Sequence, residues 1–216
     1  MSFNEKDLLE LSNSLKQRLS EERYRHTLGV ERAALALGKY CLSSRISQLR
    51  AAALLHDVAK ELSFEKLEEI LRQTDGITES DYLSPPVFHS LAAPFIIKNE
   101  YPRFATEDIL RAVKYHTTAS PDMSVFDEII FVADFIEDTR SYSASRELRE
   151  KLFSELSLSR STNESIISLH RAVVWILDFT VGYLKSKNKY INERTVVARK
   201  ELSQKYSDIL TNGREN

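Results

Sequence analysis

The stretch Ala51-Ala-Ala-Leu-Leu-His-Asp-Val-Ala59 places a histidine and a carboxylate inside a run of core-type residues. Burying a polar group without a partner costs on the order of 2–7 kcal/mol, and burying a charge costs more. His56 and Asp57 therefore need a compensating partner. The same anomaly recurs at Asp134, inside another apolar run, and at His26, on the apolar face of an earlier helical pattern. A bound metal cation is the simplest partner for all four side chains.

The composition favours an all-α protein. The chain of 216 residues contains only five glycines and five prolines, whereas loop-rich and all-β proteins depend on these residues for turns. The length suits a single domain over residues 1–216, with its core at about 20–200. A formal net charge of −2 predicts neither a nucleic-acid partner nor a membrane-surface partner.

Cysteine usage and the N-terminal residues indicate the compartment. Cys41 is the only cysteine, which excludes an intramolecular disulfide and fits a reducing environment. The first residues lack the basic and apolar regions of a signal peptide, and no stretch approaches ~18 uninterrupted apolar residues. We therefore expect a cytoplasmic protein.

Helical periodicity with capping signals covers most of the chain. Pro94 is expected to kink or shorten its helix, the serine-rich segment 141–145 is expected to be a loop, and the last few residues are expected to fray. The long apolar helix with Trp175 would form core or a subunit interface, which leaves a homodimer open. The expected helices cover about 20–42, 47–59, 64–74, 86–100 and 107–117, one that starts at Ser124 and carries Asp134, a charged one ending near 157, an apolar one at 166–184 and a basic one from 192.

The candidate metal ligands lie on or near different expected helices, so an antiparallel bundle can direct them into one cavity. Imidazoles combined with carboxylates suit zinc, iron, manganese or nickel in a site that activates water for hydrolysis. A single histidine on an apolar face is more often a core residue, and His170 is interpreted in that way because it has no partner motif. The candidates are His26, His56, Asp57, His89, His116 and Asp134.

His26, the His56-Asp57 doublet and Asp134 resemble the H…HD…D signature of the HD-domain metal phosphohydrolases, which are helical bundles. His89 and His116 fall where dinuclear members have two further histidines. The chain more closely resembles the YqeK-type symmetrical diadenosine tetraphosphate hydrolases. The segments that carry this resemblance are Arg23–Val30, Leu54–Lys60, His116–Thr118, Met123-Ser124, Ala133–Glu137 with Arg140, and Ile191–Arg199.

The resemblance implies symmetrical cleavage of diadenosine tetraphosphate to two ADP, with one or two divalent ions, iron by family. It implies that His26, His56, Asp57 and Asp134 hold an ion, and that Asp57 bridges to a second ion held by His89 and His116. Asp57, His89 and His116 are then the catalytic residues. Implied substrate contacts are Arg23, Thr27, Lys60, His89, His116, Thr117, Arg140, Thr195 and Arg199.

Several alternatives stay open at this point. Lys60 also fits a cation at a helix end, and Arg23 and Arg140 also fit surface ion pairs. The chain departs from the family at Ala119, where glycine is usual, at Asp138, where proline is usual, and in an insertion at about 153–175. Another HD-type hydrolase would act on a nucleoside monophosphate, a dNTP or a cyclic nucleotide. The other alternative is a non-catalytic nucleotide sensor, although such a sensor would have little need for ligands that activate water.

Overall fold

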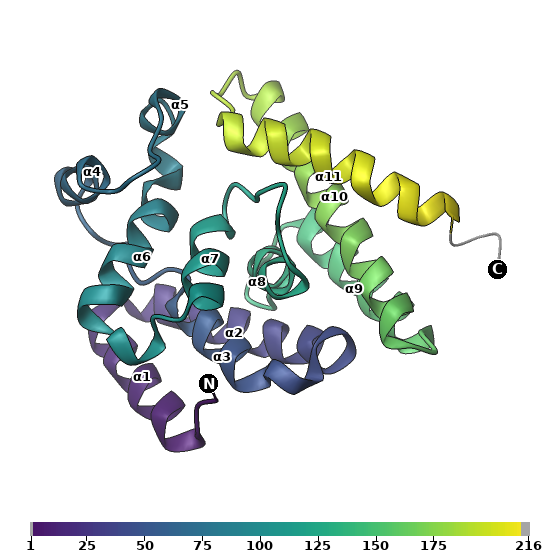
Figure 1. The fold of residues 1–216 in the computed structure, drawn as a ribbon, viewed down its shortest axis with the longest axis horizontal. Coiled ribbons are helices and arrows are strands. Elements are labelled where there is room, and N and C mark those ends of the chain that lie inside the picture. Colours follow the sequence, from purple (N-terminus) through teal and green to yellow (C-terminus); the bar gives the residue numbers. More distant parts are fainter. Residues whose placement is uncertain (1, 213–216) are drawn as a thin grey trace.

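The computed structural model describes the backbone of residues 2–212, and within that range it contains helices and no β-strand (Figure 1). The expected all-α class is confirmed. The expectation that the last residues fray concerns 213–216, which lie outside the described residues. The α-helices are α1 (Glu5–Arg18), α2 (Glu21–Cys41), α3 (Ile46–Leu55), α4 (Phe64–Arg72), α5 (Glu79–Tyr82), α6 (Phe88–Glu100), α7 (Glu107–Tyr115), α8 (Val125–Ile136), α9 (Ser143–Leu158), α10 (Thr162–Ser186) and α11 (Glu193–Asn212), with short 3₁₀ turns at Ser43–Arg45, Pro85–Val87 and Pro102–Phe104.

Side-chain caps explain why several helices begin where the sequence indicates. Ser20 Oγ accepts a hydrogen bond from the backbone amide of Arg23 at the start of α2. Ser124 and Asp127 form a reciprocal capping box at the start of α8. These caps satisfy amides that have no partner inside the helix. The helices that carry His26 and Asp134 are therefore defined by local sequence.

Helix α3 ends earlier than predicted, at Leu55 instead of residue 59. The amides of Val58, Lys60 and Leu62 each donate to a carbonyl three residues back, at 3.1, 2.9 and 3.2 Å. The chain therefore continues beyond α3 as tight turns rather than as α-helix. Apolar residues three or four positions apart lie on one face both in an α-helix and in such turns. The apolar periodicity of the sequence therefore does not distinguish the two structures. His56 is the first residue after the helix.

The structure differs in part from two further expectations about local structure. Helix α6 continues through Pro94 to Glu100 and is not shortened, because its buried apolar face, including Ile96 and Ile97, packs on its neighbours. Helix α9 begins at Ser143, inside the segment expected to be a loop. Ser145 is buried there and its hydroxyl donates to the carbonyl of Phe135 on α8. Packing in both cases outweighs local propensity.

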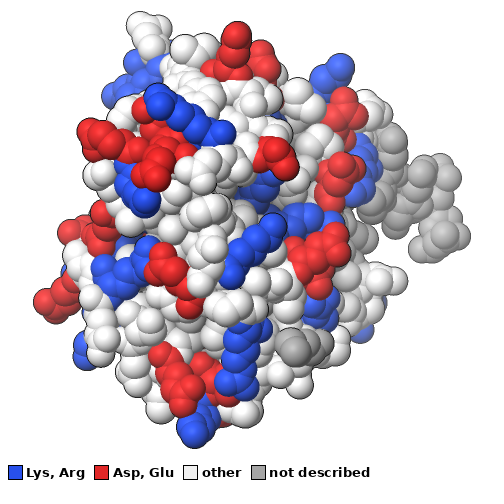
Figure 2. All heavy atoms as spheres, turned by 60° about the vertical axis from the view of Figure 1, so that its left-hand side comes forward, with Lys and Arg blue, Asp and Glu red and all other residues white. Residues whose placement is uncertain are grey.

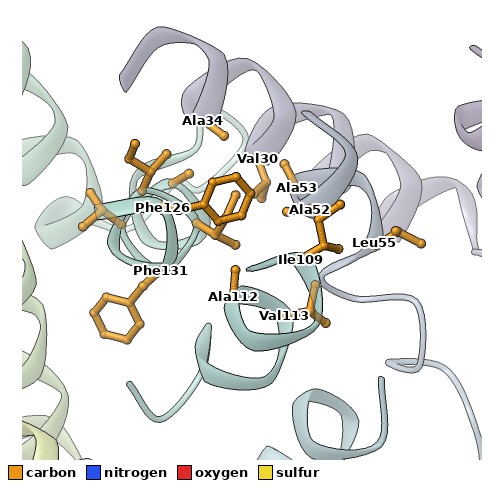
Figure 3. Close-up of a cluster of buried hydrophobic side chains, with 14 of the residues drawn as sticks. Val30, Ala34, Ala52, Ala53, Leu55, Ile109, Ala112, Val113, Phe126 and Phe131 are labelled. Carbon is orange, nitrogen blue, oxygen red and sulfur yellow. The ribbon is translucent and has the colours of Figure 1, made fainter. Parts of the chain in front are cut away.

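The helices that bear the candidate ligands pack together at the centre of the molecule. Helices α2, α3 and α8 contact one another, and α7 contacts α3, α6 and α8. Small residues such as Ala52, Ala53 and Ala112 lie among the buried side chains between α2, α3, α7 and α8 (Figure 3). Close packing of this kind leaves few voids, so the backbones that carry the ligands are held firmly.

Helices α9, α10 and α11 form a second group beside this centre (Figure 1). By length and composition alone, α10 could cross a membrane, with 44% of its most apolar window buried. It packs against α2, α8, α9 and α11. Trp175 lies half-buried on it, packed against the hydrophobic core.

A buried polar latch joins α5 to the start of α11. The Asp81 carboxylate accepts hydrogen bonds from Arg194 Nε at 2.9 Å, Arg194 Nη2 at 2.8 Å and Asn192 Nδ2 at 3.0 Å. Ser80 Oγ accepts a hydrogen bond from the Glu193 amide at 2.8 Å. Burial raises the pKa of Asp81, but the guanidinium of Arg194 and the other donors outweigh it and lower the pKa to about 2. The latch connects segments more than a hundred residues apart.

Charged side chains are spread over the surface. On the face seen in Figure 2, acidic and basic residues are intermixed. Exposed side chains of the protein form ion pairs, for example Lys66 with Glu69 and Arg32 with Asp138. Exposed pairs contribute only about 0–1 kcal/mol each. Stability therefore depends mainly on the apolar core.

Ala119 adopts a left-handed backbone conformation, with φ of 60°. This conformation costs an L-residue roughly 1–2 kcal/mol and costs glycine little, although glycine loses about 0.5–1 kcal/mol of chain entropy. We expect Ala119→Gly to raise the free energy of unfolding by about 0.5–1 kcal/mol, measured by urea denaturation. Ala112→Gly, in the middle of α7, should lower it by about 1 kcal/mol or more. Equal destabilisation by both changes would contradict the strain at Ala119.

Candidate metal centre

The six candidate ligands converge from five elements of the fold. Helix α2 supplies His26, the turn after α3 supplies His56 and Asp57, α6 supplies His89, the residue after α7 is His116, and α8 supplies Asp134. The exposed fractions of the four histidines and Asp57 are 8% or less, and the Asp134 side chain is 22% exposed. The convergence that the sequence predicts is therefore present in the structure.

His26, His56 and Asp134 form the first half of the centre. The Nε2 atoms of His26 and His56 lie 3.2 Å apart, and His26 Nε2 lies 3.1 Å from Asp134 Oδ1. His56 Nδ1 donates to the carbonyl of Ala53 at 2.7 Å, so the neutral ring has its lone pair on Nε2. The three atoms thus face one another closely enough to share one positive charge, which is a proton on His26 or a bound cation.

His89 and His116 form the second half of the centre in the same way. Their Nε2 atoms lie 3.2 Å apart, and His116 Nδ1 donates to the carbonyl of Val113 at 2.7 Å. This bond again leaves the Nε2 lone pair directed into the centre. Each half therefore contains one histidine whose ring is oriented by a backbone carbonyl, His56 in the first and His116 in the second.

Asp57 lies between the two halves. Its Oδ2 atom is 3.4 Å from His56 Nε2 and 3.7 Å from His26 Nε2. Its Oδ1 atom is 3.3 Å from His89 Nε2 and 3.6 Å from His116 Nε2. One carboxylate thus directs one oxygen to each pair of histidines. This geometry fits a carboxylate that bridges two cations, and the mixed nitrogen and oxygen donors fit a divalent transition metal.

The electrostatics of the centre favour bound positive charge. Burial raises the pKa of Asp57 and of Asp134, but nearby imidazoles and, for Asp134, the Arg140 guanidinium hold both well below the usual value. Burial lowers the pKa of His26, yet the carboxylates of Asp134 and Glu137 outweigh it and raise the pKa to about 9. Burial and the Lys60 ammonium lower the pKa of His89. The carboxylates are therefore ionised and His89 is neutral.

Glu137 orients His26, a role that the sequence did not reveal. Its Oε1 atom lies 3.1 Å from His26 Nδ1, and Thr139 donates to the carboxylate through its amide at 2.6 Å and its hydroxyl at 2.8 Å. A Cβ atom at Gly29 would overlap Glu137 Oε2, so glycine is needed there for space. A carboxylate behind a ligand histidine aligns the ring and raises its basicity.

A polar cavity of about 600 Å³ opens beside His26. Arg23 and Arg140 both line it, but each is engaged with a ligand carboxylate: Arg23 Nη1 lies 2.8 Å from Asp57 Oδ2 and Arg140 Nη2 lies 2.6 Å from Asp134 Oδ1. Arg25, which the sequence analysis did not select, also lines the cavity and is exposed. Three guanidinium groups make this cavity suitable for phosphate.

The other predicted contact residues are distributed unevenly. Lys60 Nζ lies 3.3 Å from both ring nitrogens of His89, and Thr117 Oγ1 lies 3.3 Å from His89 Nε2, so both belong to the centre. Thr27 is fully buried and its hydroxyl has no hydrogen-bond partner among the described residues. Thr195 and Arg199 are on α11 and are absent from the lining of the cavity.

Arg199 and His170 both have partners elsewhere. Arg199 Nε donates to Asp178 on α10 at 2.6 Å. His170 Nδ1 lies 2.7 Å from the buried carboxylate of Glu128, and its ring stacks on Tyr206 at 4.0 Å between centroids. Glu128 and Tyr206 satisfy His170 away from the six ligands, which agrees with its interpretation as a structural residue.

Comparison with known proteins agrees with this geometry. Residues 23–138 match the model of the HD domain family. The chain is 29% identical over 189 residues to the symmetrical bis(5'-nucleosyl)-tetraphosphatase of Halalkalibacterium halodurans, covering 87% of this chain and 92% of that protein. It is 31% identical over 153 residues to the same enzyme of Bacillus subtilis, covering 70% and 80% of the two chains.

A solved structure resembles the whole fold. It is a crystal structure from Clostridium acetobutylicum described as a predicted HD superfamily hydrolase involved in NAD metabolism. It superposes with a TM-score of 0.78 and 27% sequence identity, over 95% of this chain and 100% of that one. The helical bundle is therefore that of a known fold.

The chain belongs to the HD domain family, since the family model spans more than half of it and includes all six candidate ligands. Within that family, it is similar to the symmetrical bis(5'-nucleosyl)-tetraphosphatases.

Proposed function

We propose that this protein is a metal-dependent hydrolase that cleaves diadenosine tetraphosphate symmetrically into two ADP. The donor set around Asp57 is the observation that carries the proposal, because it suits two cations placed side by side next to a phosphate-binding cavity. Relatives named for this activity, similar over most of their length, support the choice of substrate.

Each residue of the centre has a proposed part in the reaction. His26, His56, Asp57 and Asp134 would hold one ion, and His89 and His116 would hold a second ion or contact the reacting phosphate. A divalent ion held there would lower the pKa of a bound water to about 7 and polarise phosphate oxygens. Asp57 fixes the spacing of the two halves. The neutral His89 ring, beside Lys60, can accept a hydrogen bond at its free nitrogen.

Positive side chains around the centre would stabilise the transition state. Arg23, Arg25 and Arg140 line the cavity, and Lys60 lies beside His89. Charge spreads over the phosphate oxygens during phosphoryl transfer, and fixed cations near those oxygens lower the barrier. We also propose Thr27, Thr117, Thr195 and Arg199 as contacts to the rest of the substrate. Of these, Thr117 is the one that touches a histidine of the centre.

Some finer points of the proposal rest on the family resemblance. We propose iron as the metal, with one or two ions, in a cytoplasmic protein without nucleic-acid or membrane partners. The whole chain is proposed to act as one domain, in line with a buried hydrophobic cluster that extends from Phe3 to Tyr206. A homodimer is compatible with the exposed aromatic side chains.

Product analysis tests the proposed function. Purified protein loaded with iron, manganese or zinc is incubated with diadenosine tetraphosphate, and the nucleotides are separated by chromatography. We expect ADP as the sole nucleotide product. Equal amounts of AMP and ATP would overturn the symmetrical assignment. Preference for a nucleoside monophosphate, a dNTP or a cyclic nucleotide would make the protein a different HD-type hydrolase, and tight binding without turnover would make it a sensor.

Removing either arginine beside the ligands should impair phosphate recognition. We expect Arg140→Ala and Arg23→Ala each to lower kcat/KM by roughly 10- to 150-fold, corresponding to about 1.5–3 kcal/mol for a hydrogen bond to a charged group. Arg32→Ala provides a control, because Arg32 forms an exposed ion pair with Asp138 and should change kcat/KM less than twofold or so. Unchanged kcat/KM in both Arg140→Ala and Arg23→Ala would show that neither arginine takes part in phosphate recognition.

A further inference from the structure

Five aromatic side chains form a continuous row that begins at the cavity. We call Tyr142, Phe135, Trp175, Phe179 and Tyr183 the aromatic row. Phe135 contacts Tyr142, Trp175 and Phe179 edge to face, with ring centroids 5.6, 5.9 and 5.7 Å apart. Along α10, Trp175 stacks on Phe179 at 5.4 Å and Phe179 stacks on Tyr183 at 6.3 Å.

The aromatic row is open to solvent at both ends. Tyr142 is 39% exposed and Tyr183 is 48% exposed, while Phe135, Trp175 and Phe179 are half-buried. Aromatic rings that serve only a core are normally covered. Exposed flat apolar surface that adjoins a polar cavity is typical of a ligand site.

Tyr142 connects the row to the cavity. Its side chain lines the cavity together with Arg23, Arg25 and Arg140, and the Arg140 guanidinium lies over its ring at 5.9 Å from the centroid. Arg140 in turn bonds Asp134. A ligand that reaches from the metal centre past Arg140 therefore meets an aromatic face next.

The cavity and the adjoining aromatic row together define the chemistry of the ligand that they can bind. The cavity offers guanidinium groups for an anionic chain, and the aromatic row offers flat apolar faces for a planar ring. We propose that the aromatic row binds the nucleobase of the nucleotide whose phosphates occupy the cavity, with Tyr142 as the first stacking partner. This proposal rests on the proposed function, because it assigns a second part of the same substrate. Every base has a π-face, so the row should accept purines with little discrimination.

Direct nucleotide binding tests the aromatic row without turnover. Trp175 is the chain's only tryptophan, so its fluorescence reports on the row. Metal-loaded protein is titrated with ADP, with GDP, and with inorganic pyrophosphate, which lacks a base. We expect ADP and GDP to change Trp175 fluorescence with similar dissociation constants, and Tyr142→Ala to weaken both by roughly 5- to 150-fold, the range for loss of one base–aromatic stack. Pyrophosphate affinity should stay the same.

Two further variants make the test specific. Tyr142→Phe keeps the ring and should bind ADP like the wild type. Tyr40→Ala removes a tyrosine of similar exposure, 40%, at the other end of α2, about 20 Å along the helix from His26; it should leave ADP affinity unchanged. Wild-type ADP affinity in Tyr142→Ala would overturn the proposal, as would an equal loss of pyrophosphate affinity.

The remaining outcomes distinguish the nucleobase proposal from the proposed function and from a dimer interface. Nucleotide binding that depends on Tyr142, in a protein that does not hydrolyse diadenosine tetraphosphate, would support the row and refute the proposed function. Symmetrical hydrolysis with an unchanged ADP affinity in Tyr142→Ala would support the proposed function and refute the nucleobase proposal. A Tyr183→Asp change that dissociates a dimer while ADP affinity stays constant would assign the row to a second copy of the chain and overturn the nucleobase proposal.

Discussion

Replacing Asp57 by asparagine is expected to abolish metal retention and hydrolysis together. The change keeps the shape of the side chain but removes the charge that both pairs of histidines face. Metal ions supply several kcal/mol of transition-state stabilisation, so the rate should fall by about 10³-fold or more. Metal content measured by plasma mass spectrometry and ADP release measured on the same sample provide the test.

Asp81→Asn is the matched control for this change. Asp81 is also a buried carboxylate with several hydrogen bonds, but its partners are Arg194 and Asn192 in the latch. We expect this variant to be less stable to urea and to keep its metal. If Asp57→Asn retained full metal content and rate, the assignment of the centre would be wrong.

Removing the carboxylate behind His26 should impair the metal centre itself. Partners that orient a ligand histidine typically contribute 10- to 100-fold to metal affinity, so we expect Glu137→Ala to weaken metal binding by roughly that factor. Gly29→Ala should act in the same direction, because the new methyl group displaces Glu137 without removing it. Competition with a chromogenic chelator measures both affinities.

Gly182→Ala is the control for the glycine substitution. A Cβ at this position on α10 meets nothing within 4 Å, so the change should stabilise the helix by about 1 kcal/mol and leave metal affinity alone. Metal affinity equal to wild type in both Glu137→Ala and Gly29→Ala would show that His26 needs no orienting partner.

The convergence of the candidate metal ligands could be predicted because burial makes polar residues conspicuous. His56, Asp57 and Asp134 interrupt apolar runs, and the cost of burying them unpaired indicates a shared partner. Capping serines located the helices that carry His26 and Asp134. This signal is a conflict between an apolar sequence neighbourhood and a polar side chain, so it finds polar residues inside apolar runs and overlooks polar residues that lie in polar stretches.

Glu137 and Arg25 illustrate the residues that this signal misses. Glu137 follows the end of α8 in a polar stretch, and Arg25 lies on the exposed side of α2, so neither stands out against its neighbours. The clue to Glu137 was indirect: a glycine within α2, at residue 29, where helix propensity disfavours it. The pairing of Arg199 with Asp178 was likewise invisible, because it depends on how α10 and α11 pack.

The latch between α5 and α11 has a consequence for how the molecule is made. Ser80 and Asp81 bond to residues that follow them by 110 to 113 positions. At a synthesis rate of about 5–20 residues per second, those partners leave the ribosome roughly 5–20 s later. Every metal ligand up to Asp134 has been translated well before then. The nascent chain can therefore bring its candidate ligands together before the segment around α5 has formed its hydrogen bonds to the C-terminal part of the chain.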